Sequence, residues 1–427
     1  MREDWMNIEE GTLKQMEEAV SVMESQPEKI IDSEKWFDDG QINEILFCEC
    51  FLQRKPLKCI NGNFFGLDGM ISDQEIEKEI YQMIKLVLIK GISKKVKQLV
   101  EVLRLEAHSE ELPIQMDRIH VKNGTYFLDG SFTEEKEFCL NRLPVEFIQE
   151  KGEPITWLSF LKDLLDEEDI PTLQEYMGYC LIPSNKAQKL MLILGKGGEG
   201  KSRVSLVMRS ILGTNMNMSS IQKVETNRFA RADLEHRLLM VDDEMKMKAL
   251  EETNYIKSIV TLEDKIDIER KSQQSVQGTL YVRFLGLGNG SLSALHDRSY
   301  GFYRRQLILT TKDRPKDRVD DPFLIEKLRL ETEGIFHWCL EGLERLIQNN
   351  YKFTISAKTE RNLREAMEDG NNIISFMESE GYIRLEKGTM ATSKSLYAAY
   401  CKWCDDNTEK PMSAKSLSGS VCKNTHG

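Results

Sequence analysis

The chain has 427 residues, which is enough for two or three domains that each bury a core of their own. No apolar run approaches the ~18 residues of a membrane-spanning helix, and the charged N-terminus lacks the apolar stretch of a signal peptide. The nine cysteines are scattered and odd in number, which argues against a disulfide framework and predicts a reducing, intracellular setting.

The net charge of −12 is distributed unevenly along the chain. Residues 1–40 hold twelve acids and four bases, and they account for −8 of the total. Residues 297–318 instead hold seven bases and three acids. A single basic cluster of this kind is often only a solvated face. A nucleic-acid partner is nevertheless not excluded, because a ring-shaped enzyme needs a basic lining only in its channel.

Residues 1–185 carry no motif with an obvious chemistry. Residues 1–100 are an acidic region of unknown function, with strands or turns over 59–69 and a helical stretch around 75–105. Farther along, Asn123-Gly124 and Asp129-Gly130 are hairpin signals that flank a short aromatic strand. Apolar residues at helical spacing between 155 and 181 predict two helices, separated near Pro171, a residue that suits a helix start. We therefore assign residues 101–185 to a mainly helical domain.

A short apolar run over 190–194 predicts a buried strand, and the phosphate-loop pattern G-x-x-x-x-G-K-[ST] follows it directly. The residues of this pattern are Gly195, Lys196, Gly197, Gly198, Glu199, Gly200, Lys201 and Ser202. Glycines allow backbone N–H groups to surround a triphosphate, Lys201 reaches the β- and γ-phosphates, and Ser202 offers a hydroxyl to Mg²⁺. The phosphates would lie at the N-terminus of the next helix. The sequence therefore predicts binding of a nucleoside triphosphate.

Two later strands are expected to end beside this loop. The apolar run 238–241 ends in Asp242-Asp243-Glu244, about 40 residues after Lys201. We assign Asp242 to Mg²⁺ and Asp243 to the attacking water, with Glu244 as the substitute for Asp243. The third strand, over 281–287, is followed by Asn289, which we assign to sensing the γ-phosphate. Taken alone, Asn-Gly is usually an ordinary turn, and only the preceding motifs favour this role.

An arginine pair, Arg304 and Arg305, opens a predicted strand over 307–309. The pair either lies at a solvated edge or supplies an arginine finger to the triphosphate of a neighbouring subunit. The second role requires an oligomer with ATP at the subunit interface. Arg305 is the first candidate for the finger and Arg304 the second.

The order of these motifs resembles that of the superfamily 3 helicases. It is most similar to the helicase portion of phage, plasmid and poxvirus-type primase–helicases, over residues 100–420. The stretch 255–271 looks like the segment in which that family carries a hairpin whose lysine follows single-stranded nucleic acid. Lys271 matches that position, with Arg270 and Lys257 as weaker candidates. Residues 372–417 are similar to the winged-helix unit that often closes these proteins.

The resemblance implies an α/β fold with an AAA+-like P-loop NTPase core over 186–350. A mainly helical domain precedes the core, and a small winged-helix-like domain over 351–427 stops short of its last hairpin. The implied activity is ATP hydrolysis with Mg²⁺, coupled to 3′→5′ unwinding of DNA during replication of a phage, plasmid or other mobile element. The implied setting is the cytoplasm of a bacterial host, with no membrane partner.

The implied form is a homo-oligomer, a hexamer, that acts on single-stranded DNA or a forked duplex. No priming motif precedes the helicase portion, so primer synthesis would fall to a separate primase.

Two other interpretations use the same loop. One is a non-unwinding AAA+ ATPase that loads or remodels replication partners on DNA, which strand-displacement assays would distinguish. The other is a small-molecule kinase, against which the lack of an Arg-rich lid segment counts.

Overall fold

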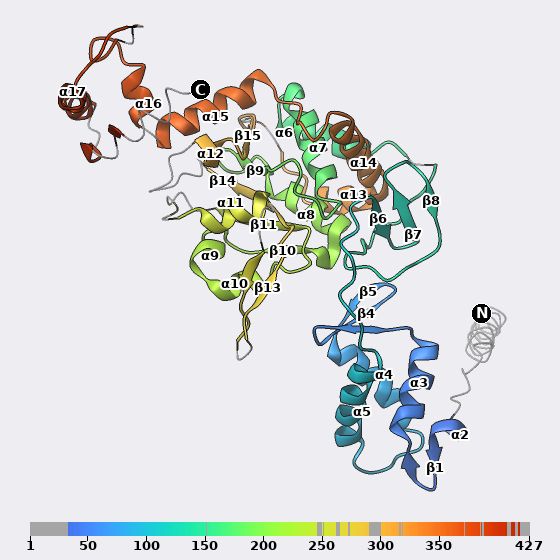
Figure 1. Ribbon diagram of the computed structural model, residues 1–427. Coiled ribbons are helices and arrows are strands. Elements are labelled where there is room, and N and C mark those ends of the chain that lie inside the picture. Colours follow the sequence, from blue (N-terminus) through green and yellow to red (C-terminus); the bar gives the residue numbers. More distant parts are fainter. Residues whose placement is uncertain are drawn as a thin grey trace, which may run out of the picture. The chain divides into compact units, whose positions relative to one another are not determined.

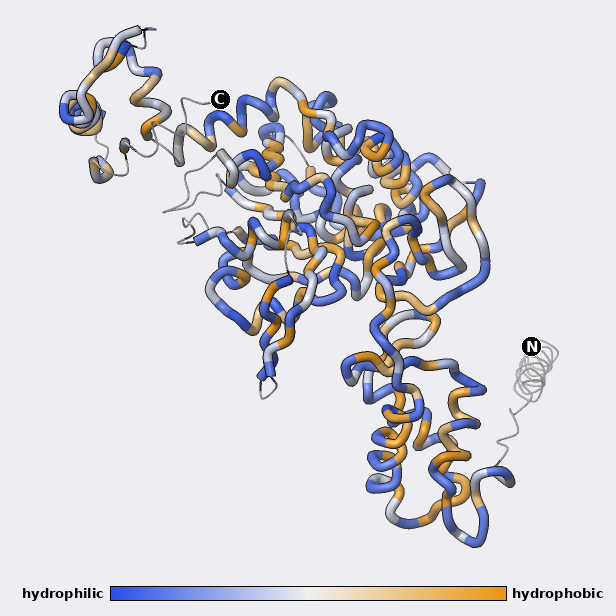
Figure 2. The backbone as a smooth tube through the Cα atoms, viewed as in Figure 1, coloured by the Kyte–Doolittle hydropathy of each residue, from blue (hydrophilic) through white to orange (hydrophobic). Residues whose placement is uncertain are grey.

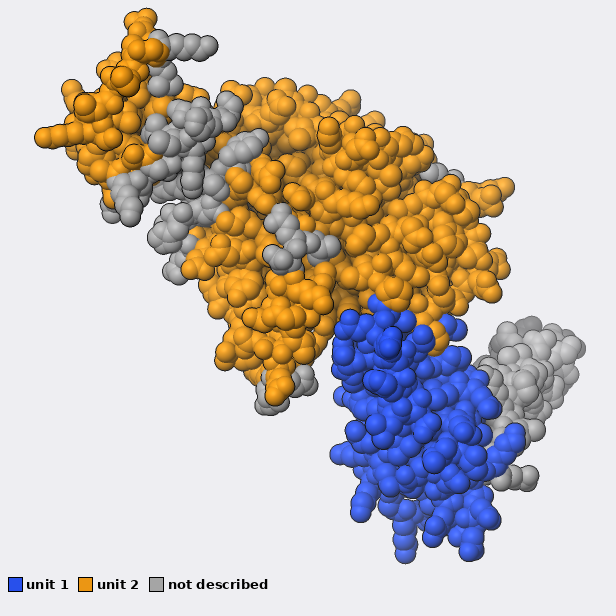
Figure 3. Space-filling view, viewed as in Figure 1, with its two compact units in different colours: residues 1–112 blue, residues 113–427 orange. Residues whose placement is uncertain are grey.

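The computed structural model describes residues 33–150, 152–245, 250, 252–261, 265–271, 274–289, 300–315, 317, 319–370, 372–384, 386, 388–407, 411–414 and 417–418. The chain divides into two compact units, residues 1–112 and 113–427 (Figures 1 and 3). The expected domain boundary between residues 100 and 101 falls inside helix α5 (Ile92–Glu106), whose apolar face belongs to the core of the first unit. The two units are therefore divided after this helix, between Leu112 and Pro113.

In the part that the structure describes, the first unit combines short strands with three main helices. Its elements are α2 (Ser33–Trp36), β1 (Phe37–Asp38), β2 (Gln41–Ile42), α3 (Glu44–Arg54), β3 (Lys58–Ile60), β4 (Asn63–Gly66), β5 (Gly69–Ile71), α4 (Asp73–Ile84) and α5. Strands β3, β4 and β5 form an antiparallel sheet where the sequence predicts strands or turns. The helical stretch expected around 75–105 is two helices: α4 ends at Ile84, and α5 begins after Gly91, which adopts a left-handed conformation (φ 69°). A capping box between Ser72 and Glu75 starts α4.

The second unit begins with a small antiparallel sheet and a pair of helices. Its first elements are β6 (Arg118–Val121), β7 (Gly124–Phe127), β8 (Phe132–Thr133), α6 (Ile155–Leu164) and α7 (Ile170–Tyr179). The two hairpin signals lie at the β6–β7 and β7–β8 connections, as predicted. The break between the helices is a single 3₁₀ turn, Glu167–Asp169, and Pro171 lies in the first turn of α7.

A five-stranded parallel sheet forms the centre of the second unit (Figure 1). Its order is β10 (Met216–Met218), β11 (Leu239–Met245), β14 (Arg283–Gly288), β9 (Leu190–Leu194) and β15 (Gln306–Thr310). The predicted strands therefore occur, and their central residues are apolar because hydrophobic clusters cover both faces of the sheet. Side chains of β11 alternate between the clusters: Leu239 and Val241 pack on one side, and Met240 on the other. This mixed α/β architecture is consistent with a nucleoside-triphosphatase core.

Helices surround this sheet, and one hairpin projects from it. The remaining elements are α8 (Ser202–Leu212), α9 (Ile221–Thr226), α10 (Arg228–Ala232), α11 (Asn254–Thr261), β12 (Ile266–Ile268), β13 (Val276–Gly278), α12 (Tyr300–Tyr303), α13 (Leu324–Leu330), α14 (Thr332–Gln348), α15 (Ala357–Gly370), α16 (Asn372–Met377) and α17 (Ser393–Asp406). Helix α8 packs in the same cluster as Leu239 and Val241. None of the described helices has the length and apolar character needed to cross a membrane.

The C-terminal region has a small hydrophobic cluster of its own. Phe376 of α16 packs near Tyr400 and Trp403 of α17, with ring centroids 5.3 and 6.1 Å apart. The expected winged-helix fold over 351–427 stays a prediction, because much of its C-terminal half lies outside the described residues.

Candidate functional site

The ends of three neighbouring strands bring the predicted motifs to one edge of the parallel sheet. In register, Leu194 at the end of β9 lies opposite Gly288 of β14, and Gly286 lies opposite Asp242 of β11. The loop 195–202 starts at this edge, and Asn289 follows β14 there. In open parallel sheets, ligands bind in the crevice beyond the carboxyl ends of the strands. The loop, the acidic residues and Asn289 thus lie where such a fold binds its ligand.

The loop 195–202 needs glycine for two different reasons. At Gly195 there is no room for a side chain, because a Cβ atom would lie 2.4 Å from Thr311 Oγ1 and 2.8 Å from Lys201 Nζ. At Gly197 and Gly200 the backbone has φ values of 112° and 107°, which residues with a Cβ rarely adopt. Helix α8 then begins at Ser202 without a side-chain cap. The backbone N–H groups of Arg203 and Val204 donate to Gly200 O and Lys201 O, so among the described residues the N–H groups of Lys201 and Ser202 are the ones open to an anion.

Glu199, inside this loop, is a buried carboxylate that holds the loop together. Its Oε1 accepts hydrogen bonds from the backbone N–H groups of Lys196 (2.5 Å) and Gly197 (2.6 Å), and its Oε2 accepts one from Lys201 Nζ (2.8 Å). Burial alone would raise the pKa of Glu199, but these hydrogen bonds outweigh it and the pKa lies below its ordinary value. Glu199 is therefore ionised at neutral pH. The pattern placed Glu199 in the nucleotide-binding loop but gave its side chain no role of its own, since this position of the motif accepts any residue.

Asp242 and Asp243 lie at the same edge but in different surroundings. Asp242 is buried, and its Oδ2 accepts a hydrogen bond from the backbone N–H of Ile221 at 2.9 Å, at the start of α9. Burial raises the pKa of Asp242, and hydrogen bonds to Ile221, Ser220 and the backbone of Glu244 oppose that rise. Asp243 lies two residues after Val241, whose side chain packs on the α8 side of the sheet. Because side chains alternate along a strand, Asp243 is expected on that same side. Its Oδ1 is buried and has no hydrogen-bond partner among the described residues.

Asn289 contacts the first residue of the loop. The Asn289 side chain is oriented with its amide nitrogen toward two backbone carbonyl oxygens. It donates to Gly195 O and, at 3.2 Å, to Gly288 O. The backbone N–H of Gly195 also donates to Gly288 O at 3.0 Å. The amide therefore connects the end of β14 to the start of the loop, and it remains exposed on its other side.

An arginine that the sequence reasoning did not assign to the site also lies over the loop. Arg314 Nη1 lies 3.4 Å from Gly198 O, and its Nη2 donates to Asp320 at 2.8 Å. Arg314, Asp320 and Leu324 form one wall of a cleft of about 380 Å³ whose other wall is residues 198–203. The basic stretch 297–318 contained the signal, but charge alone did not say which arginine would face the loop.

Arg304 and Arg305 lie at the opposite end of the sheet. The carbonyl of Arg305 accepts the backbone N–H of Leu190 at 2.8 Å, at the start of β9, whereas the loop 195–202 follows its end. Arg304 is exposed, while Arg305 is half-buried and its Nη1 donates to Gly301 O. Burial, together with Arg304 and Arg305, lowers the pKa of the nearby Lys189 to about 8. The arginine pair is thus separated from its own loop by the length of a strand.

Lys271 lies in the connection between β12 and β13, which pair as an antiparallel hairpin. Lys271 is exposed, and Figure 2 shows hydrophilic residues at the end of this hairpin. Arg270, its neighbour, makes an ion pair with Glu235. Lys257 lies in α11 and is half-buried. Of the three candidates for nucleic-acid contact, Lys271 is therefore the most accessible in this structure.

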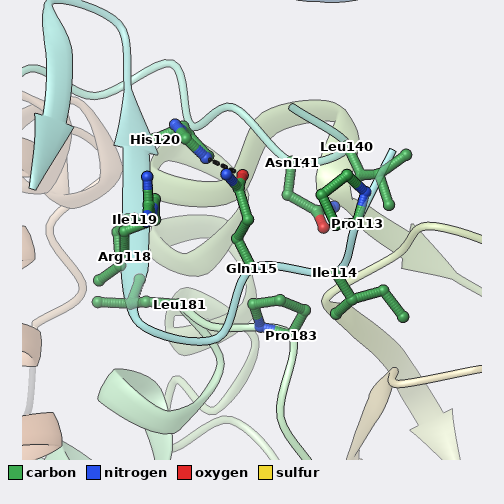
Figure 4. A pocket seen from close by; sticks show the side chains of 10 residues that line it. All are labelled: Pro113, Ile114, Gln115, Arg118, Ile119, His120, Leu140, Asn141, Leu181 and Pro183. Atoms are coloured by element: carbon green, nitrogen blue, oxygen red, sulfur yellow. Dashed lines mark hydrogen bonds between the residues drawn. The ribbon is translucent and has the colours of Figure 1, made fainter. Parts of the chain in front are cut away.

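A small cavity elsewhere in the second unit has a different character (Figure 4). It measures about 20 Å³ and lies beside His120, whose Nε2 is 2.7 Å from Gln115 Oε1 and whose Nδ1 is 3.1 Å from Thr125 Oγ1. Burial, aided by Arg142, lowers the pKa of His120 to about 4. Such a volume suits a water molecule rather than a nucleotide, so we regard this cavity as structural.

Comparison with known proteins gives a partial family match and a shared fold. A protein family of unknown function (DUF5906) matches residues 193–305, from the end of β9 to the start of β15. No similar curated protein was found. The A form of the apo NrS-1 C-terminal region is similar, with a TM-score of 0.50 and 14% identity over 77% of this chain and 76% of that chain. A second apo structure, of residues 305–718 of NrS-1, has a TM-score of 0.51 and 12% identity over 79% of this chain and 80% of that chain. At these identities the likeness shows a shared fold.

Proposed function

We propose that this protein is an ATP-dependent nucleic-acid helicase that forms a ring and serves replication of a phage or another mobile element. The observation that carries the proposal is the convergence of the glycine-rich loop, the acidic end of β11 and Asn289 at one edge of a parallel sheet. The likeness in fold to the NrS-1 C-terminal region and the resemblance of the motifs to superfamily 3 helicases support it.

In this proposal the triphosphate lies between the loop and the start of α8. Backbone N–H groups of the loop, the first turn of α8 and Lys201 would bind the phosphates, and Arg314 would close the cleft from the other side. Asn289, held against Gly195, would sense the γ-phosphate from the end of β14. Three bases (Lys201, Arg203 and Arg314) and three acids (Glu199, Asp320 and Asp321) line the cleft, so a triphosphate would replace the carboxylates that now pair with Lys201 and Arg314.

The residues present also fit a magnesium ion. Asp243 has a buried carboxylate oxygen without a hydrogen-bond partner in the described part of the chain, and the hydroxyl of Ser202 is exposed at the start of α8. We therefore assign the metal to Ser202 and Asp243, and orientation of the attacking water to Glu244. Asp242 instead stabilises the start of α9. When bound, the ion would neutralise phosphate charge.

The position of the arginine pair supports a site shared between subunits. β15 has five residues, which separate Arg304 from the loop edge by roughly 16 Å at ~3.3 Å per residue. An arginine at that end of the sheet would reach the triphosphate of a neighbouring subunit in a head-to-tail ring. We assign this role to Arg304, because the Arg305 guanidinium is engaged by Gly301. Hydrolysis would then move the Lys271 hairpin along a single strand.

Mixing two inactive variants tests this arrangement directly. Lys201→Ala removes the loop lysine and Arg304→Ala removes the finger, so each variant alone should lack ATPase activity. Mixed in equal amounts, they should recover roughly a quarter of wild-type activity, because that fraction of head-to-tail interfaces pairs an intact loop with an intact arginine. Arg305→Ala serves as the matched variant and should retain activity. No recovery on mixing, or full activity in a monomer measured by light scattering, would contradict the shared site.

Strand displacement on a forked duplex separates a helicase from an ATPase that only remodels partners. The wild-type ring should displace the labelled strand with ATP and Mg²⁺. An active, oligomeric ATPase without displacement would instead support the remodelling alternative.

A further inference from the structure

The segment 81–99 of the first unit, which runs into the first half of helix α5, carries a concentration of positive charge in an acidic chain. Between Ile80 and Val100 there are five lysines and no acid, although the whole chain has a net charge of −12. The lysines are Lys85, Lys90, Lys94, Lys95 and Lys97. All except Lys95 are exposed, and no ion pair joins those four to any residue that the structure describes. Their charge is therefore available to a partner.

A groove lies beside the start of this helix. It has a volume of about 470 Å³, and its lining includes Lys90, Lys94, Gln41 and Gln98. Lys97 is not among the residues that line the groove. Because Lys90, Lys94 and Lys97 are spaced three or four residues apart, they share one side of the helix and the turn before it, so a strand that leaves the groove along the helix would meet Lys97. Figure 2 shows that the outer side of α5 is hydrophilic.

The groove is positive even though a carboxylate lines it. Glu44 contributes that carboxylate, but it pairs with Lys95 at 2.6 Å, so these two charges cancel. Lys90 and Lys94 are left without a counter-charge from the described residues. In addition, Gly91 begins α5 without a side-chain cap, which leaves the first N–H groups of the helix directed toward the same place. Ammonium, amide and backbone donors thus converge on one concave surface.

We propose that this groove binds the sugar–phosphate backbone of a nucleic-acid strand. Lysine ammonium groups, glutamine amides and helix N-termini are the donors that contact phosphate and sugar without reading bases. The groove lining contains no arginine or aromatic side chain, so the contact is expected to be independent of sequence. This site would lie in the unit without the candidate nucleotide site, and it does not depend on the proposed ATPase.

The competing partner is an anionic lipid surface. Leu86 and Ile89 are 69% and 93% exposed near the lysines, and such residues can insert into a membrane interface. We favour nucleic acid because the lysines and amides line a concave groove, whereas a lipid headgroup layer requires a flat or convex face.

The test measures binding of the full-length chain to a fluorescein-labelled oligothymidylate by anisotropy, without nucleotide, over a series of KCl concentrations. The variant is Lys90→Ala/Lys94→Ala/Lys97→Ala. The matched control, Lys78→Ala/Lys122→Ala/Lys352→Ala, removes the same charge from exposed lysines elsewhere. Losing three phosphate contacts should reduce the slope of log K against log salt by about 2, at ~0.7 per contact for a single strand. At low salt the affinity should fall on the order of tenfold or more, while the control stays near wild type.

The same measurement in a Lys271→Ala background separates the groove from the β12–β13 hairpin. The triple variant should lower oligonucleotide affinity there as well. Equal weakening by both triple variants would mean that only overall charge matters, and it would overturn the proposal. So would a variant that keeps oligonucleotide affinity but no longer binds phosphatidylserine-containing vesicles, which would assign the groove to lipid. Circular dichroism melting confirms that both variants fold. In a Lys201→Ala background, replacing the same three lysines should lower oligonucleotide affinity by the same factor. Failure of the ATPase proposal would therefore not be mistaken for failure of the groove proposal.

Discussion

Replacing Glu199 tests whether a carboxylate inside the loop prepares it for a nucleotide. Glu199 is only 3% exposed, and it fixes the backbone of Lys196 and Gly197 through hydrogen bonds of 2.5 and 2.6 Å. Glu199→Ala removes both acceptors, so these two residues gain freedom that nucleotide binding must remove again. At about 1–2 kcal/mol per ordered residue, the cost is about 2–4 kcal/mol, or a roughly 30- to 900-fold weaker affinity.

Glu199→Gln separates the hydrogen-bond acceptor from the charge. Its amide oxygen can still accept the two backbone N–H groups, while the pair with Lys201 Nζ is lost. We expect its affinity to stay within about threefold of wild type, because the loop remains ordered and Lys201 is free to meet phosphate. Titration with a fluorescent ATP analogue gives both affinities.

A nearby carboxylate supplies the control. Asp313 pairs with Lys196 Nζ at 2.8 Å, but both side chains are more than two-thirds exposed, so Asp313→Ala should leave binding unchanged. The reasoning would be refuted if Glu199→Ala bound the analogue as tightly as wild type. It would equally fail if Glu199→Gln were as weak as Glu199→Ala, because the charge rather than the acceptor would then be what matters.

Three further predictions follow from the site and its surroundings. Asp243→Asn should lower Mg²⁺-dependent ATP hydrolysis by at least ~100-fold at unchanged melting temperature, whereas Asp242→Ala should destabilise the fold by about 1–3 kcal/mol by leaving the Ile221 N–H unpaired. Lys271→Ala should abolish strand displacement and the stimulation of ATPase by oligonucleotide, both measurable on the same preparation. The pKa of His120 is about 4 when folded and ~6.5 when unfolded, so acid favours the unfolded state. Wild type should therefore lose about 1.4 kcal/mol between pH 8 and pH 5.5, a loss that thermal melts of His120→Gln should lack.

The sequence predicted the strands and the hairpin turns well because their signals are local. The run 190–194 is apolar on every residue and is a strand over the same residues, and the hairpin signals at Asn123-Gly124 and Asp129-Gly130 also lie where hairpins form. A pattern of neighbouring residues is sufficient for such elements, since turn chemistry and burial act over a few positions.

The orientation of side chains at the site was not accessible in the same way. Asp242 and Asp243 are adjacent in sequence, and which of them faces α8 depends on the alternation of β11, whose register shifts between Asp242 and Met245. The roles of Glu199 and Arg314 depend on tertiary contacts that the motif does not specify. The location of Arg304 at the opposite end of the sheet required the strand order, which no local pattern contains.

Net charge is a poor guide to the partners of this chain, because the charges that matter are local. The excess of acid comes mostly from residues 1–40, whereas the stretch 80–100 holds five lysines without an acid. At about 0.1 M salt the field of an exposed charge is screened within ~10 Å, so acids farther away than that do not cancel a lysine in a groove. A polyanion responds to the local sum and releases counterions in proportion to the contacts it makes. The salt dependence of binding, rather than the isoelectric point, is therefore the quantity that counts the bases in contact with a strand.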